Sequence, residues 1–128
     1  MTPIEGSAVD LLQVLSGTVR GPRREGAYAL WLTLRVAEGY LLDPPLPERA
    51  ARRRLAALES RLSSLTLPPP LRRALTAALS QLKAGDAAAV PGMLSALVAP
   101  ARDTAGAEAG EAIQRAARAA RSTIAASR

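Results

Sequence analysis

Arginine side chains are the groups in this sequence most able to do chemistry. The chain has 17 basic residues, and all but Lys83 are arginine. A guanidinium binds carboxylates and phosphates through two parallel hydrogen bonds, so clustered arginines favour an acidic partner. We predict anion or partner contacts at three clusters, which comprise Arg20, Arg23 and Arg24, then Arg49, Arg52 and Arg53, and finally Arg72 and Arg73.

The position of these clusters supports the prediction. The second and third fall in the first turns of expected helices, where free amides already attract anions and a cation opposes the helix dipole. Each added cation costs about 0.3–1 kcal/mol there unless an anion offsets it. In an up-and-down bundle the first and third clusters would meet at one end of the molecule. The alternative is that these arginines are ordinary solvated surface.

The groups that usually carry enzyme chemistry are missing. The 128 residues include no histidine and no cysteine, which removes the commonest general base, the thiolate nucleophile and sulfur metal ligands. No phosphate loop or dinucleotide-binding glycine motif is present. Glu108 and Glu111 are three residues apart, but Arg115 and Arg118 share their helix face and indicate a solvated surface. We expect no catalytic site, no cofactor and no metal site.

The rest of the chain must wrap around Tyr28–Leu42, which contains all three aromatic residues. Its apolar residues recur every three or four places, so they share one face of a helix. That stripe consists of Ala27, Leu30, Leu34, Ala37 and Leu41, with Trp31 beside it. Such a helix is buried on several sides. We expect Thr33, Arg35 and Glu38 to face water.

The same periodicity predicts the other helices, and glycine and proline separate them. Residues 20–26 are predicted to form a basic turn, and Pro100 is predicted to limit the fifth helix. The pattern does not predict an element for residues 86–90. Besides the central helix, one helix is predicted over 3–16 and another over 47–65. A proline linker at 67–70 precedes a helix that ends at 83. A short helix begins at 91, and the last spans 104–126.

These elements predict an all-α fold, an up-and-down bundle of four to five helices with an alanine-rich C-terminal helix packed on it. We expect one domain over 1–128, with core helices in 1–103 and the last helix in 104–128. Leucine and alanine favour helix, and apolar residues make up 48% of the chain.

The last helix is rich in small residues, which allow two backbones to approach closely. Either it packs across its own domain or it pairs with a second chain, because alanine anchors a helix weakly. The residues predicted for such an interface are Ala109, Ala112, Ile113, Ala116, Ala120 and Ile124.

These features predict a non-enzymatic interaction or scaffold module that self-associates or docks on a larger protein. One alternative is salt-sensitive binding to the nucleic-acid backbone through the arginine clusters. Another is a small-ligand sensor with a cleft near Trp31. No span long enough to cross a membrane and no targeting segment is visible, so we expect a cytoplasmic protein.

Overall fold

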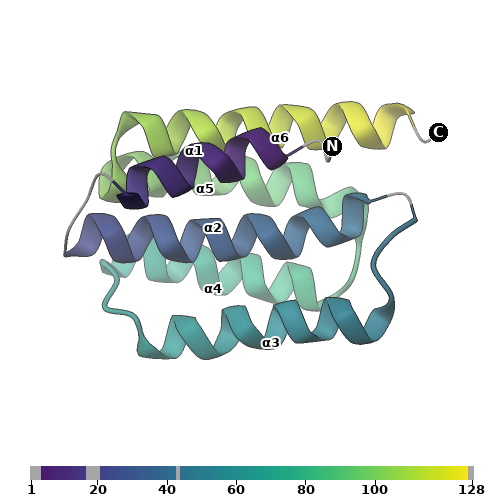
Figure 1. The fold of residues 1–128 in the computed structure, drawn as a ribbon, viewed down its shortest axis with the longest axis horizontal. Helices are drawn as coiled ribbons and strands as arrows, with labels where there is room; N and C mark the ends of the chain where they lie inside the picture. Colours follow the sequence, from purple (N-terminus) through teal and green to yellow (C-terminus); the bar gives the residue numbers. More distant parts are fainter. Residues whose placement is uncertain (1–3, 17–20, 43, 127–128) are drawn as a thin grey trace.

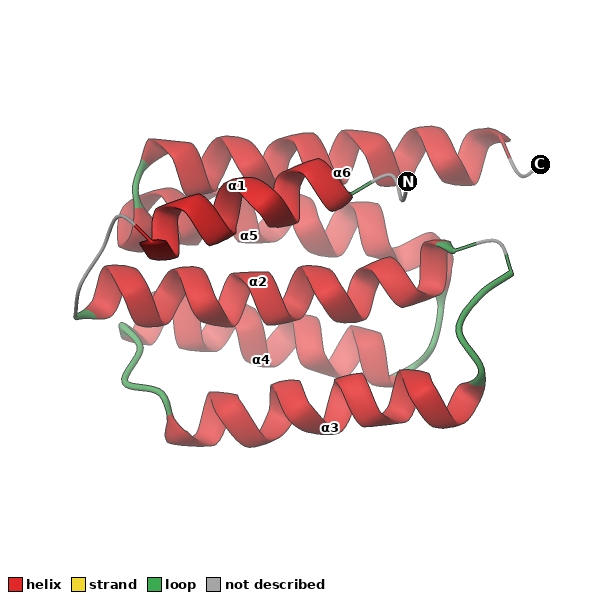
Figure 2. Ribbon diagram, viewed as in Figure 1, coloured by secondary structure: helices red, strands yellow, loops and turns green. Residues whose placement is uncertain are grey.

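The predicted all-α bundle is confirmed. The computed structural model describes residues 4–16, 21–42 and 44–126, which contain six α-helices, one short 3-10 helix and no strand (Figures 1 and 2). The elements are α1 (Glu5–Ser16), α2 (Pro22–Leu41), α3 (Glu48–Ser64), α4 (Pro69–Lys83), the 3-10 helix η1 (Ala87–Ala89), α5 (Val90–Ala105) and α6 (Ala107–Ala126). Successive α-helices alternate in direction along the long axis (Figure 1). One continuous apolar core takes side chains from all six.

Helix α2 lies at the centre of the bundle and packs against each of the other five α-helices. Its predicted stripe is confirmed, because Leu30, Leu34 and Ala37 are completely buried. Two residues that the sequence predicts to face water, Thr33 and Glu38, are buried. Thr33 is buried and donates its hydroxyl to the carbonyl of Ala29 at 2.8 Å, so the helix backbone supplies the partner that water would have been.

The starts of α2 and α4 lie together, as an up-and-down arrangement requires. A methyl group placed on Gly26 would lie 3.2 Å from Cδ2 of Leu71 and 2.7 Å from Cγ2 of Thr104. The other end of α2 is tied to α4 as well, because the Tyr40 hydroxyl donates to the Leu82 carbonyl at 2.7 Å. Burial raises the pKa of Tyr40.

The start of α2 differs from the sequence prediction. Part of the expected basic turn is helical, since α2 begins at Pro22. Proline is pre-set for the first helical position, and Gly21, with φ of 98°, makes the turn before it.

Pro100 does not limit α5, which continues to Ala105. Proline removes the amide that would bond the carbonyl of Ala96, but Ala96 is exposed and solvent can take that place. Burial of Ala101 and Ala105 favours continuing the helix into the core. Gly106, with φ of 97°, then separates α5 from α6, so the last helix begins at Ala107 rather than at 104.

Helix α6 packs on α5, α1 and α2, which settles how its small residues are used. Its inner face is completely buried at Ala109, Ala112, Ile113, Ala116 and Ala120. The two backbones approach closely at Gly110, where an added methyl group would lie 2.9 Å from Cβ of Arg102. The sequence left open whether this helix packs within the chain or pairs with a second chain. In this structure its small residues pack within the chain.

Helix α3 lies at the edge of the bundle and is the most exposed of the long helices (Figure 1). Its completely or nearly buried side chains are Leu58 and Leu62. Polar contacts add to this anchorage. Arg72 of α4 donates to the carbonyls of Leu62, at 2.9 Å, and Leu65, and so satisfies backbone acceptors at the end of α3.

Candidate functional site

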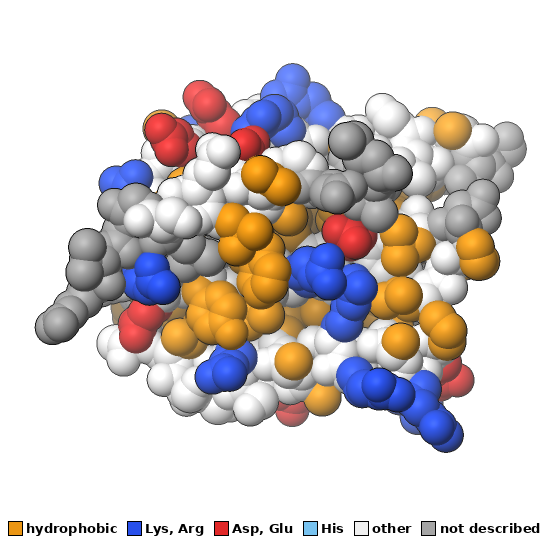
Figure 3. Space-filling model, in the orientation of Figure 1, with side chains coloured by type: hydrophobic (Ala, Val, Ile, Leu, Met, Phe, Trp, Pro, Cys, Tyr) orange, Lys and Arg blue, Asp and Glu red, His pale blue; other side chains and the backbone are white. Residues whose placement is uncertain are grey.

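An apolar patch on α1 and α2 is the best candidate for a functional surface. Val9 and Leu12 are 47% and 41% exposed, and they are the exposed large apolar side chains among the described residues. Because they are three residues apart, they share one side of α1. Tyr28, Trp31 and Leu32 of the adjacent α2 are half-buried. We call these five residues the apolar face, and Figure 3 shows apolar side chains gathered over α1 and α2 in the middle of one side of the molecule.

Aromatic stacking orders the α2 part of this face. The rings of Tyr28 and Trp31 lie 6.2 Å apart at 23° to each other, and the Arg35 guanidinium carbon lies 5.9 Å from the centre of the Trp31 ring. Cation–π contact and stacking each favour one arrangement of these side chains. The face is therefore apolar, aromatic and preorganised, with a positive charge at its edge.

A buried carboxylate holds the adjoining arginines in place. Glu38 was expected to face water, but it is only 7% exposed. Its Oε1 lies 3.7 Å from Nη1 of Arg35 and 4.0 Å from Nη1 of Arg54. Arg54 also donates to the carbonyl of Arg35 at 2.8 Å, which links α3 to α2. Glu38 is buried because two cations compensate it, a circumstance that periodicity along one helix does not reveal.

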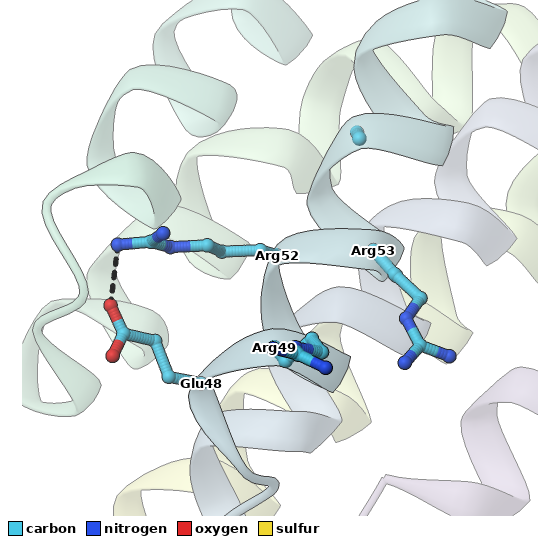
Figure 4. Close-up of a pocket in the computed structure, with 5 residues that line it drawn as sticks. Glu48, Arg49, Arg52 and Arg53 are labelled. Atoms are coloured by element: carbon cyan, nitrogen blue, oxygen red, sulfur yellow. Dashed lines mark hydrogen bonds and ion pairs between the residues drawn. The ribbon is translucent and has the colours of Figure 1, made fainter.

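The arginine cluster at the start of α3 borders a shallow hollow of about 450 Å³ lined by Glu48, Arg49, Arg52, Arg53 and Ala56. Its guanidinium groups do not converge. Arg52 and Arg53 extend to opposite sides of the helix, and Arg52 pairs with Glu48 at 2.5 Å (Figure 4). Arg49 and Arg53 are exposed. This geometry offers no cradle for a small anion.

The two clusters predicted to meet at the other end lie near each other but serve different contacts. Arg23 lies against the turn between α5 and α6, with Nη2 3.1 Å from a methyl group placed on Gly106. Arg72 is bonded to the end of α3, while Arg24 and Arg73 are exposed. Arg20 lies outside the described residues. Part of this predicted anion site therefore holds helices together.

Other charged side chains also join helices. Arg115 of α6 bonds to Asp10 of α1, beside a polar hollow of about 210 Å³ that Gln13, Glu108 and Glu111 complete. Lys83 pairs with Glu59 at 2.8 Å. Within residues 4–16, 21–42 and 44–126, no three histidine, cysteine or acidic residues are grouped so that they could hold a metal ion. No helix in these ranges has the length and apolarity needed to cross a membrane.

The residues predicted for an interface on the last helix are occupied inside the chain. All but Ile124 are completely buried, so they are not available to a partner in this fold. Ile124 is half-buried and borders a hollow of about 370 Å³ with Ala88, Pro91, Arg121 and Ala125. Arg121 crosses from α6 to α5 and donates to the Ser95 hydroxyl at 2.9 Å.

Sequence reasoning missed the exposed side of α1. Buried Ile4, Ala8 and Leu11 explain one face of this helix, and Val9 and Leu12 then remain as apolar residues beyond that stripe. An amphipathic helix with surplus apolar residues outside its core stripe was the available signal.

No family model matches the chain, and neither curated proteins nor solved structures yield a match.

Proposed function

We propose that this chain is a non-enzymatic helical interaction module that binds another protein through its apolar face. The observation that carries the proposal is the exposure of Val9 and Leu12 on α1, which packs against α2, the helix that carries the Tyr28–Trp31–Arg35 stack. Single exposed apolar residues are ordinary on a protein surface, whereas a contiguous patch with aromatic residues is typical of a contact surface.

The residue types of this surface fit a protein partner. Trp, Tyr and Arg are the residues that most often carry binding energy at protein interfaces, and all three meet at Trp31. The stack keeps these side chains in place before binding, which lowers the entropy lost on association. The bundle beneath them is continuous core, so the patch is presented on a firm support.

A protein partner fits better than a nucleic acid. The exposed arginines of the α3 cluster diverge, and Arg54 and Arg72 are engaged within the chain. The centre of the apolar face consists of uncharged side chains, which give a phosphate backbone no counter-charge. None of the three surface hollows described above is lined by Trp31, so no cleft there supports a small-ligand site.

Site-specific photocrosslinking tests the proposal. A photoreactive amino acid replaces Leu12 on the apolar face or, as a control, Ala57 on the exposed side of α3, in the native host. We expect a discrete adduct from position 12 that is absent from position 57. A Val9→Gln change in the position-12 protein should remove it, because it makes the same face polar.

Equal adducts from both positions, or an adduct that Val9→Gln leaves unchanged, would contradict the proposal. Light scattering over a dilution series of the purified chain distinguishes the two kinds of partner. A mass that stays that of one chain at high concentration excludes a second copy, and a Leu12-dependent dimer identifies it.

A further inference from the structure

We infer that the occupant of the apolar face is an acidic amphipathic helix of another protein. This rests on the proposed function and adds the chemistry of the partner. An amphipathic helix lays its apolar stripe on a complementary surface and turns its charged residues to the edges. The observations that select this occupant are the shape of the face and the charges around it.

The shape suits a rod lying along α2. In Figure 1, α2 lies between α1 and α3, and α1 supplies Val9 and Leu12 along one side. From Arg24 to Arg35 the exposed side of α2 extends eleven residues, a rise of about 16 Å. Three turns of a partner helix cover the same length.

Arginine side chains border the apolar face along α2 and α3. Arg35 is 42% exposed beside Trp31. Because α3 runs antiparallel to α2 and Arg54 contacts Arg35, exposed Arg61 lies seven residues further, about 10 Å along α3, near the level of Tyr28. Figure 3 shows both basic and acidic side chains around the apolar face.

The acidic groups near the strip do not cancel this charge. Glu38 is buried between Arg35 and Arg54, and Asp10 of α1 is bonded to Arg115. Glu25 is half-buried in the first turn of α2, where it also offsets the helix dipole. Exposed Glu108 and Glu111 of α6 lie beyond α1, on the other side of the apolar face. The exposed charge on the α2–α3 side of the face is therefore mainly positive, and carboxylates complement it.

A second copy of the chain complements it poorly. Both copies would carry a net charge of +6, and this like charge opposes their association. A nucleic acid bound here would place phosphate groups against the apolar face, between the arginines. An acidic amphipathic helix satisfies both the apolar centre and the basic edge.

Three synthetic peptides test the inference on the full chain. Each is a helix of about 18 residues, about 27 Å long, with the same leucine stripe and a polar face of glutamate, glutamine or lysine. Affinity is measured by anisotropy of labelled peptide, and fluorescence of Trp31, the single tryptophan, reports binding at the face. We expect the glutamate peptide to bind about tenfold more tightly than the glutamine peptide, and the lysine peptide most weakly.

Matched variants locate the effect. Arg61→Gln, which leaves the Trp31 stack intact, should reduce the glutamate preference without weakening the glutamine peptide. Arg118→Gln, on the exposed side of α6, changes charge elsewhere and should leave all three affinities unchanged. Leu12→Gln should weaken all three, because every peptide uses the same apolar stripe. Raising salt from about 0.05 to about 0.5 M should reduce both the glutamate preference and the weakening seen with the lysine peptide, and should change the glutamine peptide least.

Equal binding of the glutamate and glutamine peptides, with sensitivity to Leu12→Gln, would overturn the acidic partner and leave the apolar face as a docking surface. A dimer abolished by Leu12→Gln would overturn it in favour of a second copy. Loss of the position-specific adduct at residue 12, together with peptide binding unaffected by Leu12→Gln, would remove the proposed function as well.

Discussion

Neighbouring arginines of α3 have different roles, although they look alike in the sequence. Arg52 pairs with Glu48 in solvent, Arg53 is exposed, and Arg54 reaches α2. The direction in which each leaves the helix determines this, since successive residues are about 100° apart. A cluster defined by sequence position therefore contains both surface charge and a structural tie.

Arg54→Ala should destabilise the fold by about 1–3 kcal/mol. The change removes the hydrogen bond to the Arg35 carbonyl and leaves buried Glu38 with one cation instead of two. Arg53→Ala, the matched control one residue earlier, should change the free energy of unfolding by no more than about 0.5 kcal/mol. Urea unfolding measures both, and equal effects would show that Arg54 does not tie α3 to α2.

The helices differ in how they are anchored. Nine of the 20 residues of helix α6 are alanine, yet its whole inner face is buried because α5 approaches closely. Helix α3 carries larger leucine side chains, but its buried residues are Leu58 and Leu62. Its position also depends on arginine contacts at its side and its end. Close approach of two backbones thus compensates for small side chains, which size alone does not indicate.

Gly110→Ala should destabilise the α5–α6 pair by about 1–3 kcal/mol, because the methyl group would meet Cβ and Cα of Arg102 at 2.9 and 3.4 Å. These atoms belong to or adjoin the backbone and cannot swing aside. Gly92→Ala is the control. Nothing lies within 4 Å of that position in α5, so alanine should stabilise by about 0.4–1 kcal/mol. Thermal unfolding measures both, and changes of the same sign would contradict the close approach.

The whole bundle depends on its C-terminal helix. Five fully buried residues of α6, Ala109, Ala112, Ile113, Ala116 and Ala120, contribute to the shared core. At about 0.8 kcal/mol for each alanine methyl and about 2 for the isoleucine, they contribute about 5 kcal/mol. That is comparable with the total stability of a small protein.

A chain ending at Ala105 should therefore lose cooperative thermal unfolding, monitored by circular dichroism. Two point variants test the contribution of α6 without shortening the chain. Ile113→Ala should cost about 2–5 kcal/mol because Ile113 is completely buried, and half-buried Ile124→Ala should cost clearly less. A shortened chain that still melts cooperatively at the original temperature would show that α6 is dispensable for the core.

The number of helices, their periodic faces and the central place of α2 were predictable from the residues. Leu30, Leu34 and Ala37 recur at helical spacing, and that spacing records burial whatever the partner helix is. Glycine's access to positive φ permits the turns at Gly21 and Gly106, but the predicted last helix, which began at 104, ran across Gly106. The extension of α5 through Pro100 was not predictable, because burial of Ala101 and Ala105 outweighs the local preference.

The surface could not be derived in the same way. Whether Val9 is covered, whether Arg72 binds an anion or a helix end, and whether Glu38 reaches water all depend on helices distant in sequence. Arg115 finds Asp10 across 105 positions, a distance no local pattern spans. Repetition every three to four residues specifies which face of each helix turns inward, whereas long-range packing determines which of the outward faces remains open to a partner.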